Sequence, residues 1–304
     1  MSLYLKHRPV SFEQIKGNSD VITPLNGFLN DLNTCPHVFL FHGFPGCGKT
    51  TIGRILADKL GCIGSDFKEI NSANFRGIDT VRDIINNSQY KPLEGSARGW
   101  LIDEVQKMTG DAQNAFLKIL EDTPAHVYFI LCTTEPQKLI EAIKSRCQVF
   151  QVKPLDEKQM FSLLRYVIKR ENAIMPDQKV IDQIIQDSLG RPREALNTLE
   201  KVLAVSADIQ LTVAEKSAGE QLQAIELCKA LIKKAGWKEV SLIIQGLQDQ
   251  EPETIRRIIL GYCQAVLLKQ SNDQAAIIIE TLWEPLYNIG WPGLTFCCYS
   301  IIKN

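Results

Sequence analysis

A glycine-rich loop is the part of this sequence whose residue types and spacing point most directly to chemistry. Residues 43–51 read GFPGCGKTT, which matches the phosphate-binding pattern G-x-x-x-x-G-K-[ST]. Lys49 can reach β- and γ-phosphates, and the Thr50 hydroxyl is the expected Mg²⁺ ligand. The pattern predicts an ATP and Mg²⁺ site. Its expected nucleotide contacts are Gly43, Pro45, Gly46, Cys47, Gly48, Lys49, Thr50 and Thr51.

The segments on either side of the loop have the patterns that such a site needs. Residues 38–42 form a short apolar run typical of a buried strand, and residues 49–60 carry apolar side chains at helical spacing. A strand followed by a glycine loop and a helix aims unpaired N–H groups and the positive end of the helix dipole at the same phosphates. Both neighbours therefore support the phosphate-binding prediction.

Two carboxylates follow a second apolar run about fifty residues later. Residues 99–103 are predicted to form a strand that ends at Asp103, with Glu104 next. In ATPases of this kind the first acid helps to hold Mg²⁺, and the second can polarise a water for attack on the γ-phosphate. A third run, residues 127–132, ends before Thr133 and Thr134, and the sequence leaves open which hydroxyl senses the γ-phosphate.

Composition limits the classes of protein that fit. The chain has 304 residues, 45% of them hydrophobic and 23% charged, and a net charge of −1, as in a globular protein of two or three domains. Without a general basic field, nucleic-acid binding would need local basic residues or several subunits. The nine cysteines form no C-x-x-C pair, and no signal segment or membrane-length run occurs. These features predict a soluble cytoplasmic protein with reduced thiols.

Strand and helix patterns divide the chain into three predicted domains. Residues 1–153 alternate the two patterns, as an α/β nucleotide-binding sheet does, and residues 154–204 and 205–304 look wholly helical. The predicted strands are 38–42, 67–70, 99–103, 127–132 and 147–152. The predicted helices are 49–60, 78–88, 111–121, 138–144, 156–171, 176–187, 192–204, 220–235, 238–249, 252–270, 272–288 and 294–303, with a turn at 290–293.

An ordered series of segments resembles the ATPase subunits of sliding-clamp loaders. That family includes the bacterial gamma/tau subunit, the small subunits of replication factor C and phage counterparts. The matching segments are YLKHRP (4–9), FEQIKGN (12–18), NSANFRGID (71–79), DEVQKMT (103–109), NAFLKILEDTP (114–124), TTEPQKL (133–139) and SRC (145–147). The resemblance is dense over residues 4–200. It implies an AAA+ parallel-sheet P-loop ATPase domain, an all-α lid and an all-α collar that mediates oligomerisation.

The resemblance assigns a role to each matching residue. It implies that Asp103 helps to hold Mg²⁺, that Glu104 is the catalytic base and that Thr133 is the first sensor. Arg146 would be an arginine finger that reaches a neighbour's ATP, which fits the charge that develops on the γ-phosphate oxygens. The remaining implied nucleotide contacts are Lys49 and Thr50 in the loop, Arg8 and Pro9 near the N-terminus, and Arg193 as the second sensor on the lid.

The same resemblance implies partners. These are other clamp-loader subunits in a pentamer, the sliding clamp and primer-template DNA, with no membrane. Arg76, Arg82 and Lys107 lie in segments that match the DNA-facing side of the family, and each is also compatible with an ordinary solvated charge. Contacts from these residues to DNA phosphates would be independent of base sequence and strongly salt-dependent.

Two features depart from the bacterial gamma/tau pattern. Residues 60–67 contain one cysteine where gamma/tau subunits carry a four-cysteine module, which predicts no zinc. No long extension follows the collar, so tethering domains for a polymerase or helicase are expected to be absent. The compact form resembles phage loaders and replication factor C small subunits. Phage or cellular origin stays open, and a phage protein would act in the host cytoplasm.

Other functions remain possible on sequence grounds. A related hexameric motor in recombination or branch migration shares much of the ATPase pattern, but the SRC triplet and the helical C-terminal segment favour a loader. A non-hydrolysing scaffold subunit of the same loader is disfavoured by the intact loop together with Glu104, Arg146 and Arg193. A simple P-loop kinase fits least, because the sequence offers no acceptor site.

Overall fold

A computed structural model describes residues 1–72, 77–248, 250–269, 271–286 and 289–303. The chain forms two compact units, Met1–Ala207 and Asp208–Asn304. Arg76, one of the three candidate DNA contacts, lies outside the described residues. The division of the first unit at residue 153 stays a prediction.

The first unit is built on a parallel five-stranded sheet with the strand order β2-β3-β4-β1-β5. All four strand pairs are parallel, and β1 lies between β4 and β5. The strands are β1 (Val38–His42), β2 (Phe67–Asn71), β3 (Arg98–Asp103), β4 (Val127–Thr133) and β5 (Gln148–Gln151). The carboxyl ends of β1, β3 and β4 therefore meet at one edge, where a parallel sheet binds its ligands.

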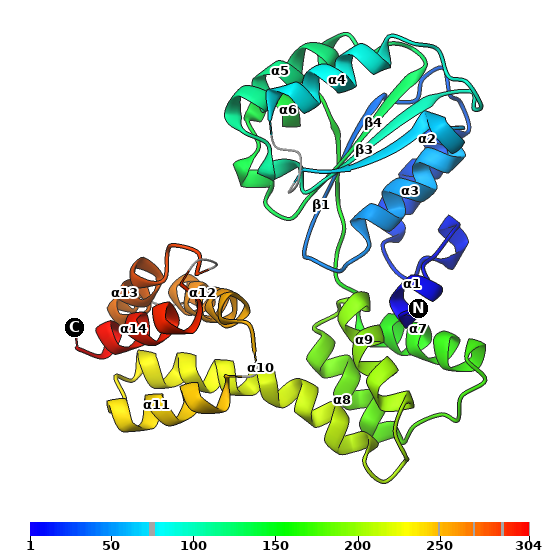
Figure 1. Cartoon of the computed structure of the whole chain (residues 1–304). Coiled ribbons are helices and arrows are strands. Elements are labelled where there is room, and N and C mark those ends of the chain that lie inside the picture. Colours follow the sequence, from blue (N-terminus) through cyan, green and yellow to red (C-terminus); the bar gives the residue numbers. More distant parts are fainter. Residues whose placement is uncertain (73–76, 249, 270, 287–288, 304) are drawn as a thin grey trace. The chain divides into compact units, whose positions relative to one another are not determined.

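Side chains alternate between the two faces of the sheet, and helices cover both. Phe39 and Phe41 pack in one core with α2 and α3, whereas Val38 and Leu40 pack in the other with α4, α5 and α6. Figure 1 shows these two helical layers on either side of the strands. The helices are α2 (Ser19–Leu29), α3 (Lys49–Lys59), α4 (Ile78–Ser88), α5 (Gly110–Glu121) and α6 (Glu141–Lys144). The predicted α/β P-loop fold class is thereby confirmed.

Short helices and a helical subdomain complete the first unit. A capping box starts α7, in which Asp156 accepts the Gln159 backbone N–H and the Gln159 side chain accepts the Asp156 backbone N–H. The N-terminal helix packs on α9, and the Leu3 N–H donates to Glu200 at 3.1 Å. These elements are α1 (Leu3–Lys6), α7 (Glu157–Arg170), α8 (Gln178–Ser188), α9 (Pro192–Leu203) and four 3₁₀ turns, η1 (Phe12–Gln14), η2 (Gly64–Asp66), η3 (Val105–Lys107) and η4 (Pro136–Lys138).

The second unit is helical around its own apolar core. Its helices are α10 (Gln210–Ile232), α11 (Trp237–Gly246), α12 (Pro252–Lys269), α13 (Asp273–Thr281) and α14 (Gly290–Lys303). The predicted turn at 290–293 is wrong, since these residues form the first turn of α14, where a proline costs no helical hydrogen bond. In the ranges that the structure describes, no helix combines the length and the apolar character needed to span a membrane.

Candidate active site

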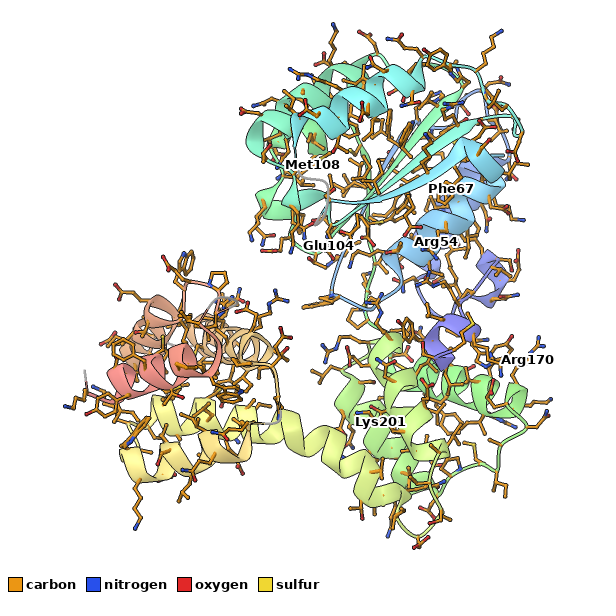
Figure 2. The ribbon with its side chains drawn as sticks, viewed as in Figure 1. Arg54, Phe67, Glu104, Met108, Arg170 and Lys201 are labelled. Atoms are coloured by element: carbon orange, nitrogen blue, oxygen red, sulfur yellow. The ribbon has the colours of Figure 1, made fainter. Side chains whose placement is uncertain are left out.

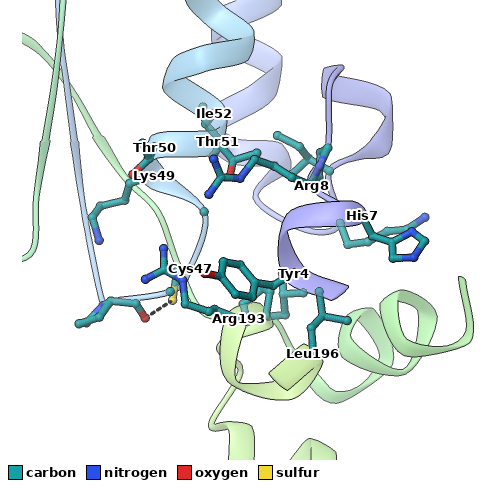
Figure 3. Close-up of a pocket in the computed structure, with 18 of the residues that line it drawn as sticks. Tyr4, His7, Arg8, Cys47, Lys49, Thr50, Thr51, Ile52, Arg193 and Leu196 are labelled. Carbon is teal, nitrogen blue, oxygen red and sulfur yellow. Dashed lines mark hydrogen bonds between the residues drawn. The ribbon is translucent and has the colours of Figure 1, made fainter. Parts of the chain in front are cut away.

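A cavity of about 350 Å³ lies in the first unit beside the glycine-rich loop. Its walls come from the loop, the start of α3, the N-terminal segment, the ends of β2 and β3 and the start of α9. Figure 3 shows Lys49, Thr50 and Thr51 on one side of it, with Tyr4, Arg8 and Arg193 on another. The predicted site residues among its walls are Arg8, Pro9, Pro45, Gly46, Cys47, Gly48, Lys49, Thr50, Thr51, Asp103, Glu104 and Arg193.

The glycines of the loop are required by its backbone path. Gly43 has φ 149°, and a Cβ atom there would lie 2.1 Å from the Val152 carbonyl oxygen. Gly48 has φ 102° and is the N-cap of α3, so it offers no side chain to the first N–H groups of that helix. Those N–H groups and the helix dipole therefore face the loop, which suits an anion.

Lys49 is a buried cation, with only 6% of its surface exposed. Its Nζ donates to the carbonyl oxygens of Gly43 at 2.9 Å and Phe44 at 3.0 Å. Burial lowers the pKa of Lys49, and nearby acidic groups, including Cys132 and Glu104, raise it in part. Neutral carbonyls compensate a buried charge incompletely, so this ammonium has a strong electrostatic preference for an anionic ligand.

Thr50 and Asp103 bring a hydroxyl and a carboxylate together at the end of β3. The Thr50 Oγ1 donates to Asp103 Oδ2 at 2.8 Å, and the second carboxylate oxygen accepts the Glu104 backbone N–H at 3.0 Å. Hard oxygen ligands of this kind are those that Mg²⁺ takes in phosphate sites. The donor set therefore fits the predicted ion.

Glu104 stands at the carboxyl ends of the strands, as Figure 2 shows. Its Oε2 accepts from the Gln106 side-chain amide at 2.5 Å and from the Thr134 hydroxyl at 3.4 Å. Thr133 is fully buried and donates to Gln106 Oε1 at 2.7 Å. Neither threonine is among the walls of the cavity, but both connect to the candidate base through Gln106.

Two arginines line the cavity, Arg193 from the start of α9 and Arg8 from the N-terminal segment. The Arg193 guanidinium lies over the Tyr4 ring, with 5.6 Å between its carbon and the ring centroid. The Arg193 backbone N–H points to the Gly46 carbonyl oxygen at 3.5 Å, which ties the start of α9 to the loop. Burial lowers the pKa of Arg8, and the charges of Arg54 and Arg193 lower it further. Lys49, Arg8 and Arg193 therefore place positive charges around the cavity. Asp103 and Glu104 are the acidic side chains that line it.

Arg146 lies away from this cavity. Its Nη1 donates to the Ala142 carbonyl oxygen at 2.8 Å, and its Nη2 forms an ion pair with Glu121. Within its own chain it is not among the residues that line the nucleotide cavity. The predicted role of Arg146 towards a neighbour's nucleotide stays a prediction.

The two described DNA candidates lie near the starts of neighbouring helices. Arg82 is in α4 and pairs with Asp79 at 3.0 Å, while Lys107 ends the turn before α5. Residues of α4 and α5 pack against one another. Both positions stay predictions as DNA contacts.

All nine cysteines are free thiols. Across the described parts of the chain, no group of three or more His, Cys, Asp or Glu side chains could hold a metal ion.

Several functional candidates were missed from the sequence. Gln106 is the most central, since it joins Glu104 to both threonines. It lies between Val105 and Lys107 in the matched segment 103–109, but that match assigned it no role. The apolar walls of the cavity were also not singled out. Helical periodicity over 156–171 and 192–204 could have indicated Leu163 and Leu196. Further apolar wall residues are Leu155 and two residues of the matched segments 4–9 and 12–18, Tyr4 and Ile15.

Comparison with known proteins shows what this chain is similar to. A family model described as "DNA polymerase III, delta subunit" matches residues 63–156. The chain is 32% identical over 304 residues to DNA polymerase III subunit tau of Escherichia coli K12, covering 90% of this chain and 47% of that protein. It is 34% identical over 235 residues to subunit gamma/tau of Mycobacterium tuberculosis H37Rv, covering 70% of this chain and 40% of that protein.

A solved structure supports the fold. The Thermotoga maritima RuvB Holliday junction branch migration motor matches with a TM-score of 0.61 and 18% identity, over 74% of this chain and 79% of that one. The chain spans less than half the length of the gamma/tau relatives named above. The resemblance inferred from the motif series is confirmed. The chain is related to the gamma/tau subunits of DNA polymerase III.

Proposed function

We propose that this chain is an ATPase subunit of a sliding-clamp loader, which uses ATP binding and hydrolysis to open the clamp and load it onto primer-template DNA. One observation carries the ATPase part of the proposal. A single cavity brings together Lys49, Thr50, Asp103, Glu104 and Arg193, which come from segments up to 144 positions apart in sequence (193 − 49). Sequence similarity to gamma/tau subunits supports the proposed role in clamp loading.

The loop side of the cavity would bind the phosphates. Lys49 would exchange its two carbonyl partners for β- and γ-phosphate oxygens, and the first N–H groups of α3 would bind the same anion. Thr50 and Asp103 would hold Mg²⁺, which neutralises charge on the phosphate oxygens when it is bound.

Glu104 would act as the general base. It lies at the strand ends with a carboxylate held by neighbouring donors, where it could orient a water and accept its proton. Arg193, from the lid, would contact the phosphates from the opposite wall and so link nucleotide state to the position of α9.

Arg146 would complete the site of a neighbouring subunit. It is absent from the walls of its own cavity and about one third exposed, so it could meet a nucleotide on another chain after leaving Glu121. A guanidinium placed across an interface in this way is worth about 10³–10⁵ in rate. Hydrolysis would then depend on assembly with other loader subunits.

DNA contacts are proposed at the starts of α4 and α5. Arg82 and Lys107 are the described candidates there, and helix N-termini also favour phosphates. Sliding clamp and primer-template DNA are the partners that this function requires.

The test measures ATP hydrolysis by the complex that assembles on the tagged full chain. We expect primer-template DNA and clamp to stimulate hydrolysis, and we expect Glu104→Gln to lower kcat by about 10²–10⁴ while ATP still binds. Hydrolysis that ignores both DNA and clamp would contradict a loader. ATP binding without any turnover in the full complex would instead favour the scaffold role.

A further inference from the structure

The amide of Gln106 is the centre of a small hydrogen-bond network between the candidate base and the candidate sensor. The side chain is buried, with 7% of the residue exposed. Its Nε2 donates to Glu104 Oε2 at 2.5 Å and to Thr134 Oγ1 at 3.0 Å, and its Oε1 accepts from Thr133 Oγ1 at 2.7 Å. Among the described residues, no other side chain forms hydrogen bonds to both Glu104 and Thr133.

Local backbone geometry holds Gln106 in this place. Glu104 adopts a left-handed conformation with φ 53° and ψ 40°, which is uncommon for a glutamate. The turn η3 follows at once, closed by the Lys107 N–H bond to the Glu104 carbonyl oxygen at 2.8 Å. This tight turn brings the Gln106 side chain back towards the carboxylate two residues before it. An unusual backbone at a candidate base is a feature often associated with function.

The donor and acceptor inventory fixes which way the amide points. An ionised Glu104 carboxylate only accepts hydrogen bonds, so the NH₂ group of Gln106 must face it. The carbonyl oxygen of the amide then faces Thr133, whose hydroxyl must donate its one proton to Gln106. That hydroxyl also accepts the Glu135 backbone N–H at 3.0 Å. Thr133 therefore has no second proton to give.

We propose that Gln106 is a positioning residue that couples the Thr133 hydroxyl to the Glu104 carboxylate. The proton that Thr133 gives to Gln106 is the one that it would give to a γ-phosphate oxygen, so it cannot serve both at once. Contact with the γ-phosphate would release the amide from Thr133 and change how it holds Glu104. The inference rests on the proposed ATPase function, and in particular on Glu104 as the base.

The first experiment removes the amide with little change in volume. Gln106→Met and Thr133→Val, singly and together, are compared in the assembled complex for kcat, for binding of a fluorescent ATP analogue and for thermal unfolding. Thr123→Val is the control, because its hydroxyl also donates to a carbonyl oxygen but lies outside this network. We expect Gln106→Met to lower kcat about tenfold or more, with little change in nucleotide affinity.

Coupling is measured by the double variant. If Gln106 and Thr133 act as one unit, the double variant loses about as much kcat as the more damaging single variant, since neighbours in one network are not additive. If the fold-loss of kcat in the double variant instead equals the product of the two single-variant losses, Gln106 and Thr133 have independent roles and the proposal is overturned. An unchanged or increased kcat in Gln106→Met would overturn it as well.

A rescue variant separates positioning from packing. Neutral histidine has one donor and one acceptor, so Gln106→His can serve both Glu104 and Thr133, whereas protonated histidine is a donor at both nitrogens. We expect Gln106→His to recover kcat relative to Gln106→Met, and to lose it below about pH 6.5 more steeply than the unsubstituted protein does. Equal activity of Gln106→His and Gln106→Met at all pH values would contradict the coupling.

The Glu104→Gln variant keeps the two hypotheses apart. If it hydrolyses ATP normally, the proposed function fails and this inference fails with it. If Glu104→Gln is inactive while Gln106→Met keeps normal kcat, only the positioning role of Gln106 is wrong.

Discussion

At the scale of single residues, the cavity derives its affinity for anions from charges that protein contacts only partly compensate. Lys49 is the clearest case, because its ammonium is buried against two neutral carbonyls and its pKa is lowered by that burial. In the nucleotide-free protein this charge is therefore a cost to folding. The same burial favours phosphate binding, since the ammonium is already desolvated in the folded protein.

Because the charge of Lys49 attracts phosphates but costs folding free energy, we expect Lys49→Met to have opposite effects on ATP binding and on the stability of the nucleotide-free protein. The substitution keeps the length of the side chain and removes its charge. We expect ATP affinity to fall at least about tenfold, because a charge-assisted contact worth roughly 1.5–3 kcal/mol is lost. Without nucleotide, we expect a thermal midpoint equal to or above that of the unsubstituted protein. Thermal unfolding with and without ATP measures both.

Lys59→Met is the matched control for this prediction. It removes the same kind of charge at the exposed end of α3, outside the walls of the cavity, and so should retain most of the nucleotide-dependent stabilisation. A large loss of nucleotide-free stability in Lys49→Met would mean that the ammonium stabilises the loop through its carbonyl contacts.

At the scale of elements, a buried ion pair in the second unit ties α12 to the segment after α13. Glu253 accepts two bonds from Arg256 and the Leu286 backbone N–H at 2.9 Å, and Arg256 also donates to the Leu282 carbonyl oxygen at 2.7 Å. The hydrogen bonds from Arg256 hold the pKa of Glu253 at about 2. One carboxylate thus satisfies a buried guanidinium and a buried N–H group.

Glu253→Gln should therefore destabilise this unit and change its response to acid. Loss of one partner from a buried pair costs about 3–5 kcal/mol. Because the folded pKa lies below the unfolded value near 4.5, the stabilisation is complete above about pH 5 and is lost as the pH falls towards 2. The variant should lack this part of the acid dependence. Urea unfolding followed by tryptophan fluorescence suits the test, since Trp237, Trp283 and Trp291 lie in this unit.

Glu251→Gln supplies the comparison for that prediction, because this glutamate is exposed and close in sequence. It should cost little at any pH. Equal losses in the two variants would show that the ion pair with Arg256 contributes nothing specific.

The central strands of the sheet, β1, β3 and β4, could be predicted from the sequence because they are buried on both faces. Runs such as 38–42 and 127–132 are apolar almost throughout, and β1 and β4 match them to within one residue. Helix boundaries in the second unit were predicted less well. Helix α10 begins at Gln210 and not near 220, and α13 ends at Thr281 and not at 288. Amphipathic patterns in a helical unit give the type of element but not where a chain turns.

Only the part of the site encoded in contiguous motifs could be predicted. The loop and the pair Asp103 and Glu104 each form a local pattern, so spacing was enough to identify them. Helices α1 and α2 were not predicted, and α2 contains Pro24, which weakens its helical pattern. Gln106 acquires its contacts with Thr133 and Thr134 only when β3 and β4 pair side by side. Such tertiary contacts leave no trace in periodicity.

At the scale of the whole molecule, the position of Arg146 raises the question of how many chains form one active site. Within its own chain the guanidinium bonds to Glu121 and to the Ala142 carbonyl oxygen, apart from the cavity that holds Glu104. If the proposed function is right, each chain gives its arginine to a neighbour and receives one in return. Arg146→Ala should then reduce turnover in the assembly by about 10³ or more without weakening ATP binding to the same chain.

Mixing two inactive variants tests this exchange directly. Arg146→Ala lacks the finger and Glu104→Gln lacks the base, so assemblies of either variant alone contain no complete site. In assemblies that contain both, a site is complete wherever an Arg146→Ala chain receives the arginine of a Glu104→Gln neighbour. Random mixing places about one quarter of neighbouring pairs in that order at a heterologous interface. We therefore expect hydrolysis to return on mixing, in proportion to such pairs. If each chain held its whole site, no mixture could recover activity, because every single chain would still lack one of the two groups.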